Sequence, residues 1–338
     1  MAVRRYQPGD ESQIQTLFQK TFHQERPLDA WEWKFKQNPK HKEPFILVFE
    51  ENGKILGHIS LWLMSAYIKG CVETVGVRVD TMVDPDARGK GIYKHLNDAL
   101  IEEGRKAGIT YLYGFPAPKA KELFLRYTGA SHLTDMPRWM YVQKPVSLLA
   151  SKLSLLKVLK PLDRVYGKIR KSKKTPHGYE VKRITRCDDA FDKLAEKTKH
   201  TADGLVVRDA VYLNWRFFDH PVHHYKMTAL YKQGQLQGYV ITHEKEGRFR
   251  NGMIVDWLAV DDDAWRALLE EALSVLREAD IVQSWALPSM MPAHLMKKNG
   301  FVHKDSPMPL VGKEIESDNT DMNDPDKWFI TPGDVDSY

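Results

Sequence analysis

VDPDARGKGIYKHL, residues 83–96, is the stretch of this 338-residue chain that indicates most about its fold. A strand ends at its start, Pro85 turns the chain, and Gly89 and Gly91 precede the apolar face of a helix. Glycine suits these positions because it accepts positive φ and lets a ligand approach the backbone. The free N–H groups of a helix start, the helix dipole and two neighbouring basic side chains favour a phosphate or pyrophosphate.

Other phosphate-binding loops fit these residues less well. The spacing Gly-x-x-x-x-Gly-Lys-Ser/Thr of a P-loop is absent. The dinucleotide pattern Gly-x-Gly-x-x-Gly fails because Lys94 stands where its third glycine is required. An ordinary helix-starting turn with solvated charges remains the alternative.

The segments on either side predict a mixed α/β fold with one helical crossover after the glycine turn. Helical spacing of apolar residues predicts a helix that Asp10 caps, and Asn52-Gly53 is typical of a hairpin turn. The expected strands cover residues 3–6, 45–49, 55–63, 75–83, 109–115 and a segment ending at 142; the expected helices cover 10–22, 31–35, 92–108 and 117–127.

The second half repeats part of this order, which predicts two tandem domains. The aligned pairs are Trp33 and Trp215, Phe35 and Phe217, Pro39 and Pro221, Gly53 and Gly234, Gly57 and Gly238, Pro116 and Pro288, and Gly129 and Gly300. Chance is the alternative, since these residue types punctuate many folds. The expected boundaries are 1–143 for the first domain, 144–176 for a linker, 177–312 for the second domain and 313–338 for an acidic tail.

The linker mixes leucines with lysines, and two interpretations stay open. It is either an amphipathic connector packed on both domains or a basic helix that makes weak contact with an anionic membrane surface or a partner. In the acidic tail, Trp328 and Phe329 predict that part of the segment docks on the protein.

The glycine turn resembles the acyl-CoA pyrophosphate signature of the GNAT superfamily, Gln/Arg-x-x-Gly-x-Gly/Ala. It matches at Arg88 and Gly91, while Tyr93 stands where the family has Gly or Ala. The resemblance covers about residues 1–143 and implies that acyl-CoA is the cosubstrate. The implied cofactor-binding residues are Arg88, Gly89, Lys90, Gly91, Ile92 and Tyr93, with the backbone of Met82 and Val83 beside the pantetheine arm.

The second half resembles the same fold without this signature. At the corresponding place the sequence is Val260-Asp261-Asp262-Asp263-Ala264-Trp265, and three carboxylates repel a pyrophosphate. We therefore expect a degenerate, non-catalytic copy that shapes the substrate cleft.

The resemblance implies acyl transfer from a thioester to an amine, which needs a base, oxyanion donors and an acid. Asp80, polar on an apolar strand, is the expected base, and a structural hydrogen bond or ion pair is the equal alternative. Family members often place a Tyr four residues before a Gly-Phe pair on the fourth helix. Here Leu125 holds that position before Gly129-Ala130, so the acid is assigned to the nearby Tyr127 as a hypothesis.

The composition excludes several other classes. The two cysteines, Cys71 and Cys187, favour reduced thiols over a disulfide framework. The N-terminus lacks the apolar run of a signal peptide, and no segment is apolar enough to span a membrane, so a cytoplasmic protein is expected. The histidines at 200, 220, 223 and 224 match no standard ligand spacing, so no metal is expected. The net charge of +5 is mild, and no nucleic-acid partner is expected.

These observations favour an acyl-CoA-dependent N-acyltransferase that moves an acetyl group from acetyl-CoA to a small-molecule amine or amino sugar. Two alternatives stay open. One is a transferase resembling the tandem GNAT proteins that use aminoacyl-tRNA for peptidoglycan bridges, although that group generally lacks the Arg-x-x-Gly turn. The other is a non-catalytic acyl-CoA-binding sensor, which would keep the turn and lose the acid and base.

Overall fold

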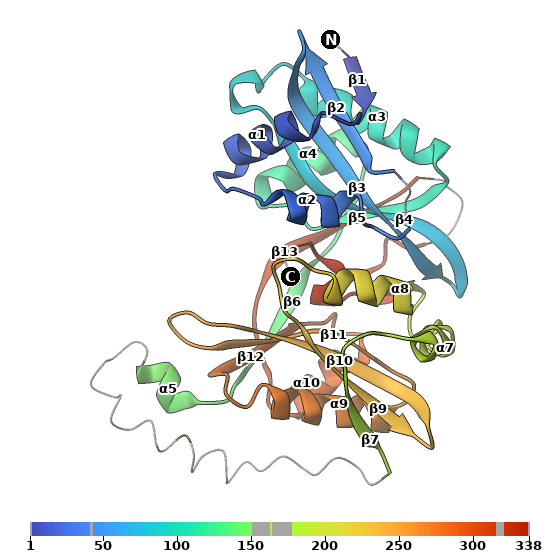
Figure 1. The fold of residues 1–338 in the computed structure, drawn as a ribbon, viewed down its shortest axis with the longest axis vertical. Helices are drawn as coiled ribbons and strands as arrows, with labels where there is room; N and C mark the ends of the chain where they lie inside the picture. The colour runs from blue at the N-terminus through green and yellow to red at the C-terminus, as the bar shows by residue number, and fades with distance from the viewer. Residues whose placement is uncertain (1, 41–42, 151–162, 164–177, 316–320, 337–338) are drawn as a thin grey trace.

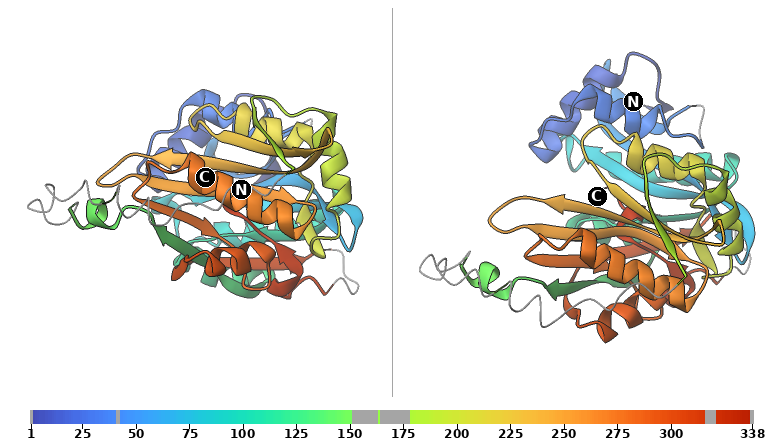
Figure 2. Two further views of the ribbon diagram at one scale, coloured as in Figure 1. Left: turned by 90° about the horizontal axis from the view of Figure 1, so that it is seen from below. Right: turned by 60° about the horizontal axis from the view of Figure 1, so that its bottom comes forward.

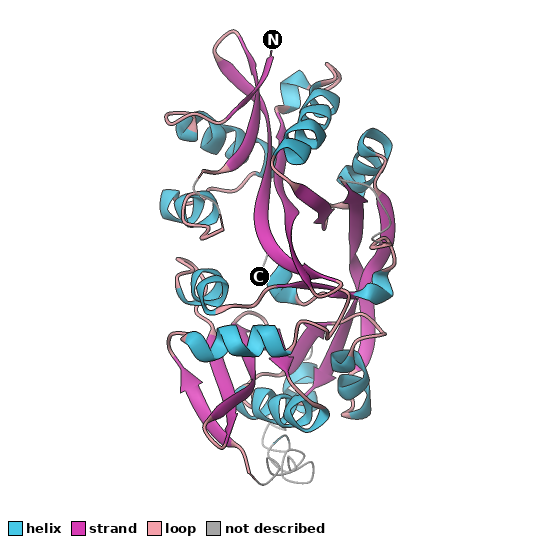
Figure 3. Ribbon diagram, turned by 90° about the vertical axis from the view of Figure 1, so that its right-hand side faces the viewer, coloured by secondary structure: helices cyan, strands magenta, loops and turns pink. Residues whose placement is uncertain are grey.

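The N-terminal half is a mixed sheet with helices on both faces. The computed structural model describes residues 2–40, 43–150, 163, 178–315 and 321–336. The first half contains β1 (Ala2–Arg5), α1 (Glu11–Phe22), α2 (Leu28–Phe35), β2 (Phe45–Glu51), β3 (Lys54–Ile68), β4 (Cys71–Val83), α3 (Ile92–Lys106), β5 (Ile109–Gly114), α4 (Pro118–Thr128) and β6 (Ser131–Val142). Figure 3 shows helices on either side of this sheet.

The C-terminal half has a similar order of elements, with the additional strands β8 and β14. A short helix, α5 (Pro145–Ala150), precedes it. The elements of the C-terminal half are β7 (Glu180–Ile184), α7 (Asp189–Lys197), β8 (Gly204–Val206), α8 (Ala210–Leu213), a π-helical turn (Asn214–Phe218), β9 (Lys226–Lys232), β10 (Gln235–Lys245), β11 (Asn251–Ala259), α9 (Asp262–Val275), β12 (Ile281–Trp285), α10 (Met291–Lys298), β13 (Val302–Glu314) and β14 (Trp328–Phe329).

One continuous sheet joins the two halves, in the order β1-β2-β3-β4-β5-β13-β6-β12-β11-β10-β9-β7. The two central strands are exchanged. β13, from the end of the second half, pairs with β5, while β6, from the end of the first half, pairs with β12. Figure 1 shows β6 and β13 crossing the middle of the molecule. Each half therefore completes its sheet with a strand from the other.

Alternating side chains of the strands divide the first half into two apolar layers, as expected for a sheet covered on both faces. Ile46 and Val48 pack in the layer that holds α1 and α2. Phe45 and Leu47 face the other layer, which contains the buried face of α3. This alternation fixes which helix lies over each side of β4.

The aligned tryptophans lie against each other at the junction of the halves. Trp33 Nε1 donates a hydrogen bond of 2.8 Å to the carbonyl oxygen of Trp215, and Trp215 Nε1 donates one of 3.0 Å to that of Trp33. Their rings stack with centroids 5.3 Å apart. Such reciprocal contacts arise when two similar elements meet about an approximate two-fold axis. The domain boundaries themselves stay a prediction.

The segment after β13 docks between the halves. Trp328 and Phe329 are buried, and β14 pairs in parallel with β8, which confirms the prediction that this segment packs on the protein. The right-hand view of Figure 2 shows red chain from near the end of the sequence between the blue N-terminal half and the orange C-terminal half. Most of the linker at 144–176 lies outside the described residues, and so does its predicted membrane contact.

Several local predictions are confirmed and one is wrong. Asn52 and Gly53 both have positive φ, as their hairpin turn requires. Asp10 holds the N-cap position of α1 but its side chain accepts no capping hydrogen bond. Its carboxylate instead accepts two hydrogen bonds from Arg4, because that cation lies beside it on β1. Among the described residues, both cysteines are free thiols, and no helix is long and apolar enough to cross a membrane.

Candidate functional site

A pocket opens where β4 and β5 separate. These parallel strands pair from Thr74 to Arg78 on β4, and the last pair joins Arg78 to Gly114. Beyond it, β4 continues to Val83 with pairing to β3 alone. A cavity of about 190 Å³ lies at this divergence. It is lined by Phe22, Arg78, Val79, Asp80, Thr81, Tyr93, Gly114, Phe115, Pro116, Ala117, Ala120, Phe124 and Asp336.

The glycine turn lies at the same end of β4 and starts α3. Gly89 and Gly91 have φ of 87° and 77°, values that side chains other than glycine rarely adopt. Gly91 is the N-cap of α3, and no side chain caps the helix. The first helical hydrogen bond runs from the N–H of His95 to the carbonyl of Gly91. The N–H groups of the first turn therefore point out of the exposed turn, as an anion site requires.

The side chains around this turn fit a negatively charged group. Nothing lies within 4 Å of the place where a Cβ on Gly89 would stand, so the turn is open to a ligand. Arg88 is exposed, and no ion pair joins it to the described residues. Lys90 lies 3.3 Å from a carboxylate oxygen of Glu51, so part of its charge is already balanced. Arg88 is therefore the freer of the two cations.

The corresponding connection of the second half is built differently. Residues 84–91 join β4 to α3, whereas only residues 260–261 join β11 to α9. The side chain of Asp261 accepts a hydrogen bond of 2.8 Å from the N–H of Ala264 and so caps α9. A short connection, a filled cap and the carboxylates of Asp262 and Asp263 leave no anion site there.

Asp80 lines the pocket as one member of a buried charge cluster. It has φ of 44° and lies at a bulge where the β3–β4 register shifts. The bulge turns its side chain toward Lys34 on α2, whose Nζ lies 2.7 Å from Oδ1, and toward Arg26 in the connection before α2, which pairs with Oδ2. Burial alone would raise the pKa of Asp80, but Lys34 and Arg26 outweigh it and hold that pKa well below its ordinary value of 3.8.

His58 supports the bulge from β3. Its Nδ1 lies 2.7 Å from the carbonyl oxygen of Asp80, and because a carbonyl only accepts, Nδ1 carries the hydrogen. Burial lowers the pKa of His58 to about 4, against an ordinary value of 6.5. His58 is therefore neutral near pH 7, and its buried Nε2 has no partner in the described part of the chain.

The second half contains a similar buried pair. Arg26 and Arg208 each stand seven residues before an aligned tryptophan, and Asp80 and Asp256 each stand three residues before the end of a strand. Arg208 Nε lies 3.1 Å from Asp256 Oδ1, with both side chains almost fully buried. An arginine–aspartate pair thus recurs where no glycine turn exists. The ion pairs of Asp80 are those expected from the alternative interpretation of this residue, in which its role is structural.

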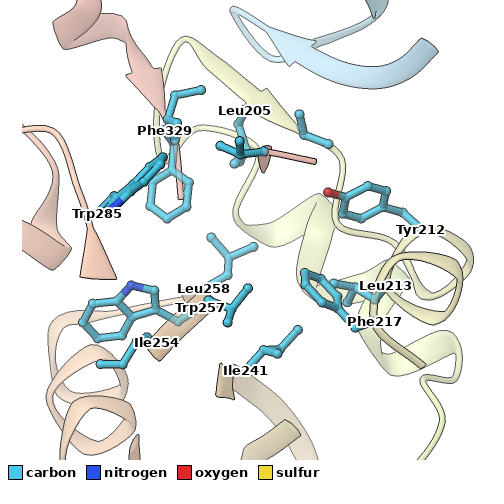
Figure 4. Packing of buried hydrophobic residues seen from close by; sticks show 14 of the residues in the cluster. Leu205, Tyr212, Leu213, Phe217, Ile241, Ile254, Trp257, Leu258, Trp285 and Phe329 are labelled. Atoms are coloured by element: carbon cyan, nitrogen blue, oxygen red, sulfur yellow. The ribbon is translucent and has the colours of Figure 1, made fainter. Parts of the chain in front are cut away.

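The tail fills the second half at the place where the first half is open. Thr331 Oγ1 donates a hydrogen bond of 2.7 Å to Asp256, and the ring of Phe329 lies 6.0 Å from that of Trp265. Trp265 follows the first buried residue of α9, as Tyr93 follows that of α3. Figure 4 shows Phe329 beside Trp285 in this apolar cluster. Tyr93, in contrast, lines the open pocket.

Arg78 is a pocket residue that the sequence reasoning missed. It donates hydrogen bonds to Thr81 Oγ1 at 3.0 Å, to Asn97 Oδ1 at 2.7 Å and to the Tyr93 hydroxyl at 3.0 Å. Its guanidinium also lies 4.2 Å from the ring centroid of Phe124. All these partners are neutral, and burial lowers the pKa of Arg78. The sequence did contain a signal for it, because Arg78 is the one basic residue in the expected strand at 75–83.

The remaining predicted site residues lie around the pocket in different roles. The Met82 side chain is buried, so only its backbone is accessible to a ligand. Ile92 packs in the core layer of α3. Tyr127 is half-buried and does not line the cavity; its ring lies 5.8 Å from that of Tyr93. Asp336 lines the cavity and pairs with Lys34 at 2.8 Å, which the sequence did not indicate.

The histidines of the second half form an aromatic cluster. His220 packs on Trp33 with ring centroids 4.2 Å apart and contacts His223 at 4.7 Å. Burial and the charge of Arg216 lower the pKa of His220 to about 3. No group of three or more metal-ligating side chains occurs within the described ranges.

Comparison with known families places this site in a domain of known type. Residues 2–127 match the family model described as an acetyltransferase (GNAT) domain. The resemblance of this part of the chain to the GNAT superfamily is thereby confirmed. The match covers less than half of the chain, so a second domain of the same kind stays a prediction. No curated protein sequence matches the chain significantly.

Solved structures share the fold across nearly the whole chain. A GCN5-related N-acetyltransferase from Anabaena variabilis superposes with a TM-score of 0.70 at 13% identity, over 93% of this chain and 72% of that one. A conserved protein from Enterococcus faecalis, described as a probable N-acyltransferase, gives 0.67 at 15% identity, over 93% and 72%. A GCN5-related N-acetyltransferase from Kribbella flavida gives 0.63 at 13% identity, over 92% and 70%. The predicted mixed α/β fold is confirmed.

Proposed function

We propose that this protein is an acyl-CoA-dependent N-acyltransferase that transfers an acetyl group from acetyl-CoA to an amine of a small molecule or amino sugar. The family match at residues 2–127 and the shared fold support acyl transfer as the reaction class. The observation that carries the proposal is the start of α3, where Gly91 leaves the helix without a side-chain cap. An anion bound there would satisfy the free N–H groups.

In this proposal the pyrophosphate of CoA binds the Arg88–Gly91 turn, and its arm follows the unpaired edge of β4 past Val83 and Met82. That edge is available because pairing with β5 ends at Arg78. When bound, acyl-CoA would supply a thioester carbonyl that an amine attacks. The pocket residues would orient the acyl group and the amine and exclude water from them.

Two carboxylates on the pocket wall are candidates for the general base. Asp80 faces the pocket, but its two cations favour the ionised form and make it a weak proton acceptor. Asp336 is a second carboxylate on the pocket wall. Asp80 as base and Tyr127 as acid both stay predictions.

The ion pairing of Asp80 specifically favours a second candidate function, a non-catalytic acyl-CoA sensor. Calorimetry with acetyl-CoA, followed by detection of released thiol across a library of amines, separates the two. The enzyme proposal predicts one CoA site per chain and turnover with at least one class of amine. One site without turnover would favour the sensor, and no CoA binding would refute both.

A further inference from the structure

The charged groups that line the pocket or pair with its lining include one cation more than their carboxylates balance. Arg26 and Lys34 lie around Asp80, and Lys34 also pairs with Asp336. These four charges cancel. Arg78 is the fifth charged group, and in the described part of the chain it has no carboxylate partner. A cation withdrawn from water without a counterion costs stability, so its retention calls for a reason.

The second half shows that the fold does not require this arginine. Arg78 pairs with Leu61, four residues after Gly57, while Ile254 pairs with Thr242, four residues after Gly238. Ile254 is therefore the structural counterpart of Arg78. It is fully buried in an apolar cluster. The same strand position is thus apolar where the tail fills the space and cationic where the pocket is open.

The hydrogen bonds of Arg78 leave donors free for a ligand. A guanidinium has five N–H groups, and Nε, Nη1 and Nη2 each use one. One N–H remains on each Nη atom, an arrangement that suits the two oxygens of a carboxylate. Thr81, Asn97 and Tyr93 hold the guanidinium in place, so little side-chain entropy is lost when an anion binds.

We propose that Arg78 forms a carboxylate subsite in the pocket between β4 and β5, so that one of the two reactants carries a carboxylate. This inference rests on the proposed function. If the CoA arm runs along Val83 and Met82, Arg78 lies farther along β4 on the side of the transferred acyl group. The carboxylate then belongs either to the far end of the acyl group or to the amine acceptor.

Matched ligand pairs test the subsite and distinguish its two sources. Succinyl-CoA and butyryl-CoA have acyl chains of equal length that differ in a terminal carboxylate. Phenylalanine and phenethylamine, each offered with acetyl-CoA, differ in the same way on the acceptor side. Affinity and kcat/KM are measured for the wild-type chain, Arg78→Met and Arg78→Lys. Arg105→Met, at an exposed position on α3, is the control.

The wild-type chain should favour the carboxylate member of one pair by about tenfold or more, as expected for a charge-assisted hydrogen bond. Arg78→Met should remove this preference, Arg78→Lys should keep part of it, and Arg105→Met should leave it unchanged. Affinity for CoA without an acyl group should change less than about twofold in Arg78→Met, which also reports that the variant is folded.

Three outcomes overturn the inference. If CoA binds but the wild-type chain prefers neither carboxylate, the subsite is wrong and the proposed function survives. If the preference persists in Arg78→Met, the carboxylate is held elsewhere. If CoA does not bind the wild-type chain, the proposed function fails and the subsite fails with it.

Discussion

The starts of α3 and α9 show how one fold produces two different helix ends. Gly91 begins α3 without a side-chain cap after a connection of residues 84–91. Asp261 begins α9, and its own carboxylate satisfies the N–H of Ala264. The first helix can stabilise a bound anion, whereas the second already contains one. A difference of side chain at the cap therefore separates a ligand site from a structural turn.

The interiors behind these turns also differ, because one is open to a ligand and the other is filled by the chain itself. In the first half, Arg78 and Asp80 border an open pocket. In the second half, Ile254 is apolar and the chain around Thr331 bonds directly to Asp256. The second half thus uses the protein's own tail where the first half leaves room for a ligand. The predictions below test whether this contrast is functional.

The largest effect is expected from Gly91→Val. Valine is strained at a φ of 77° and would cover the N–H groups that we assign to the pyrophosphate. Calorimetry should show a loss of acetyl-CoA affinity of at least about 100-fold. Asp263→Val, in the acidic turn of the second half, should bind as the wild-type chain does. Unchanged affinity in Gly91→Val, with native circular dichroism, would remove the central argument.

Asp80→Asn and Asp256→Asn test whether the two buried pairs are equivalent. Asp80→Asn leaves Arg26 without its carboxylate, so it should lower the free energy of unfolding by about 3–5 kcal/mol in denaturant titrations. Asp256→Asn should cost less, because Arg208 still pairs with Asp334 at 2.8 Å. A general base adds a second effect: Asp80→Asn alone should lower turnover by about 10²-fold and flatten the acid limb of the pH–rate profile. Similar turnover in both variants would leave Asp80 with a structural role.

The aligned positions 58 and 239 should also differ in their response to acid. His58 follows Gly57, and Tyr239 follows Gly238 at the aligned position. The pKa of His58 falls from 6.5 to about 4 on folding, so between these values the unfolded chain binds a proton that the folded chain does not. Stability is complete above pH 6.5 and declines as the pH falls toward 4, by up to about 3 kcal/mol.

Unfolding titrations of the wild-type chain and His58→Gln from pH 7 to pH 4 measure this difference. The variant should lose less stability over that range, because glutamine does not titrate. His220, whose pKa is also lowered, remains in both proteins and cancels from the comparison. If the unfolding free energies of the two proteins change with pH in parallel, His58 is protonated equally in the folded and unfolded chains.

The smallest effects concern the two cations of the glycine turn. Arg88→Ala should weaken CoA binding by about tenfold, because it removes an exposed charge that forms no ion pair with the described residues. Lys90→Ala should weaken it less, since Glu51 already shares that charge. Both should matter less for pantetheine analogues that lack the phosphates. Equal losses for CoA and these analogues would show that the charges act elsewhere.

Local patterns gave most of the fold in advance. The period of the apolar residues located the strands and helices of the first half, and the glycines at 53 and 91 have the positive φ that their turns require. The exchange of β6 and β13 had no such signal, because strand pairing between distant segments depends on contacts that no short window contains. The pairing of the aligned tryptophans was likewise invisible until the two halves met.

For the site, the sequence by itself determined the glycine turn, its basic residues and its absence from the second half, because backbone conformation and charge there depend on neighbouring residues. Only the tertiary structure decided what surrounds Asp80. Simple alternation along the strand would place Asp80 on the same face as Arg78, but the bulge turns it to the opposite face, among Lys34 and Arg26. The sequence shows that a carboxylate is present, whereas the charges that set its pKa come from segments distant along the chain.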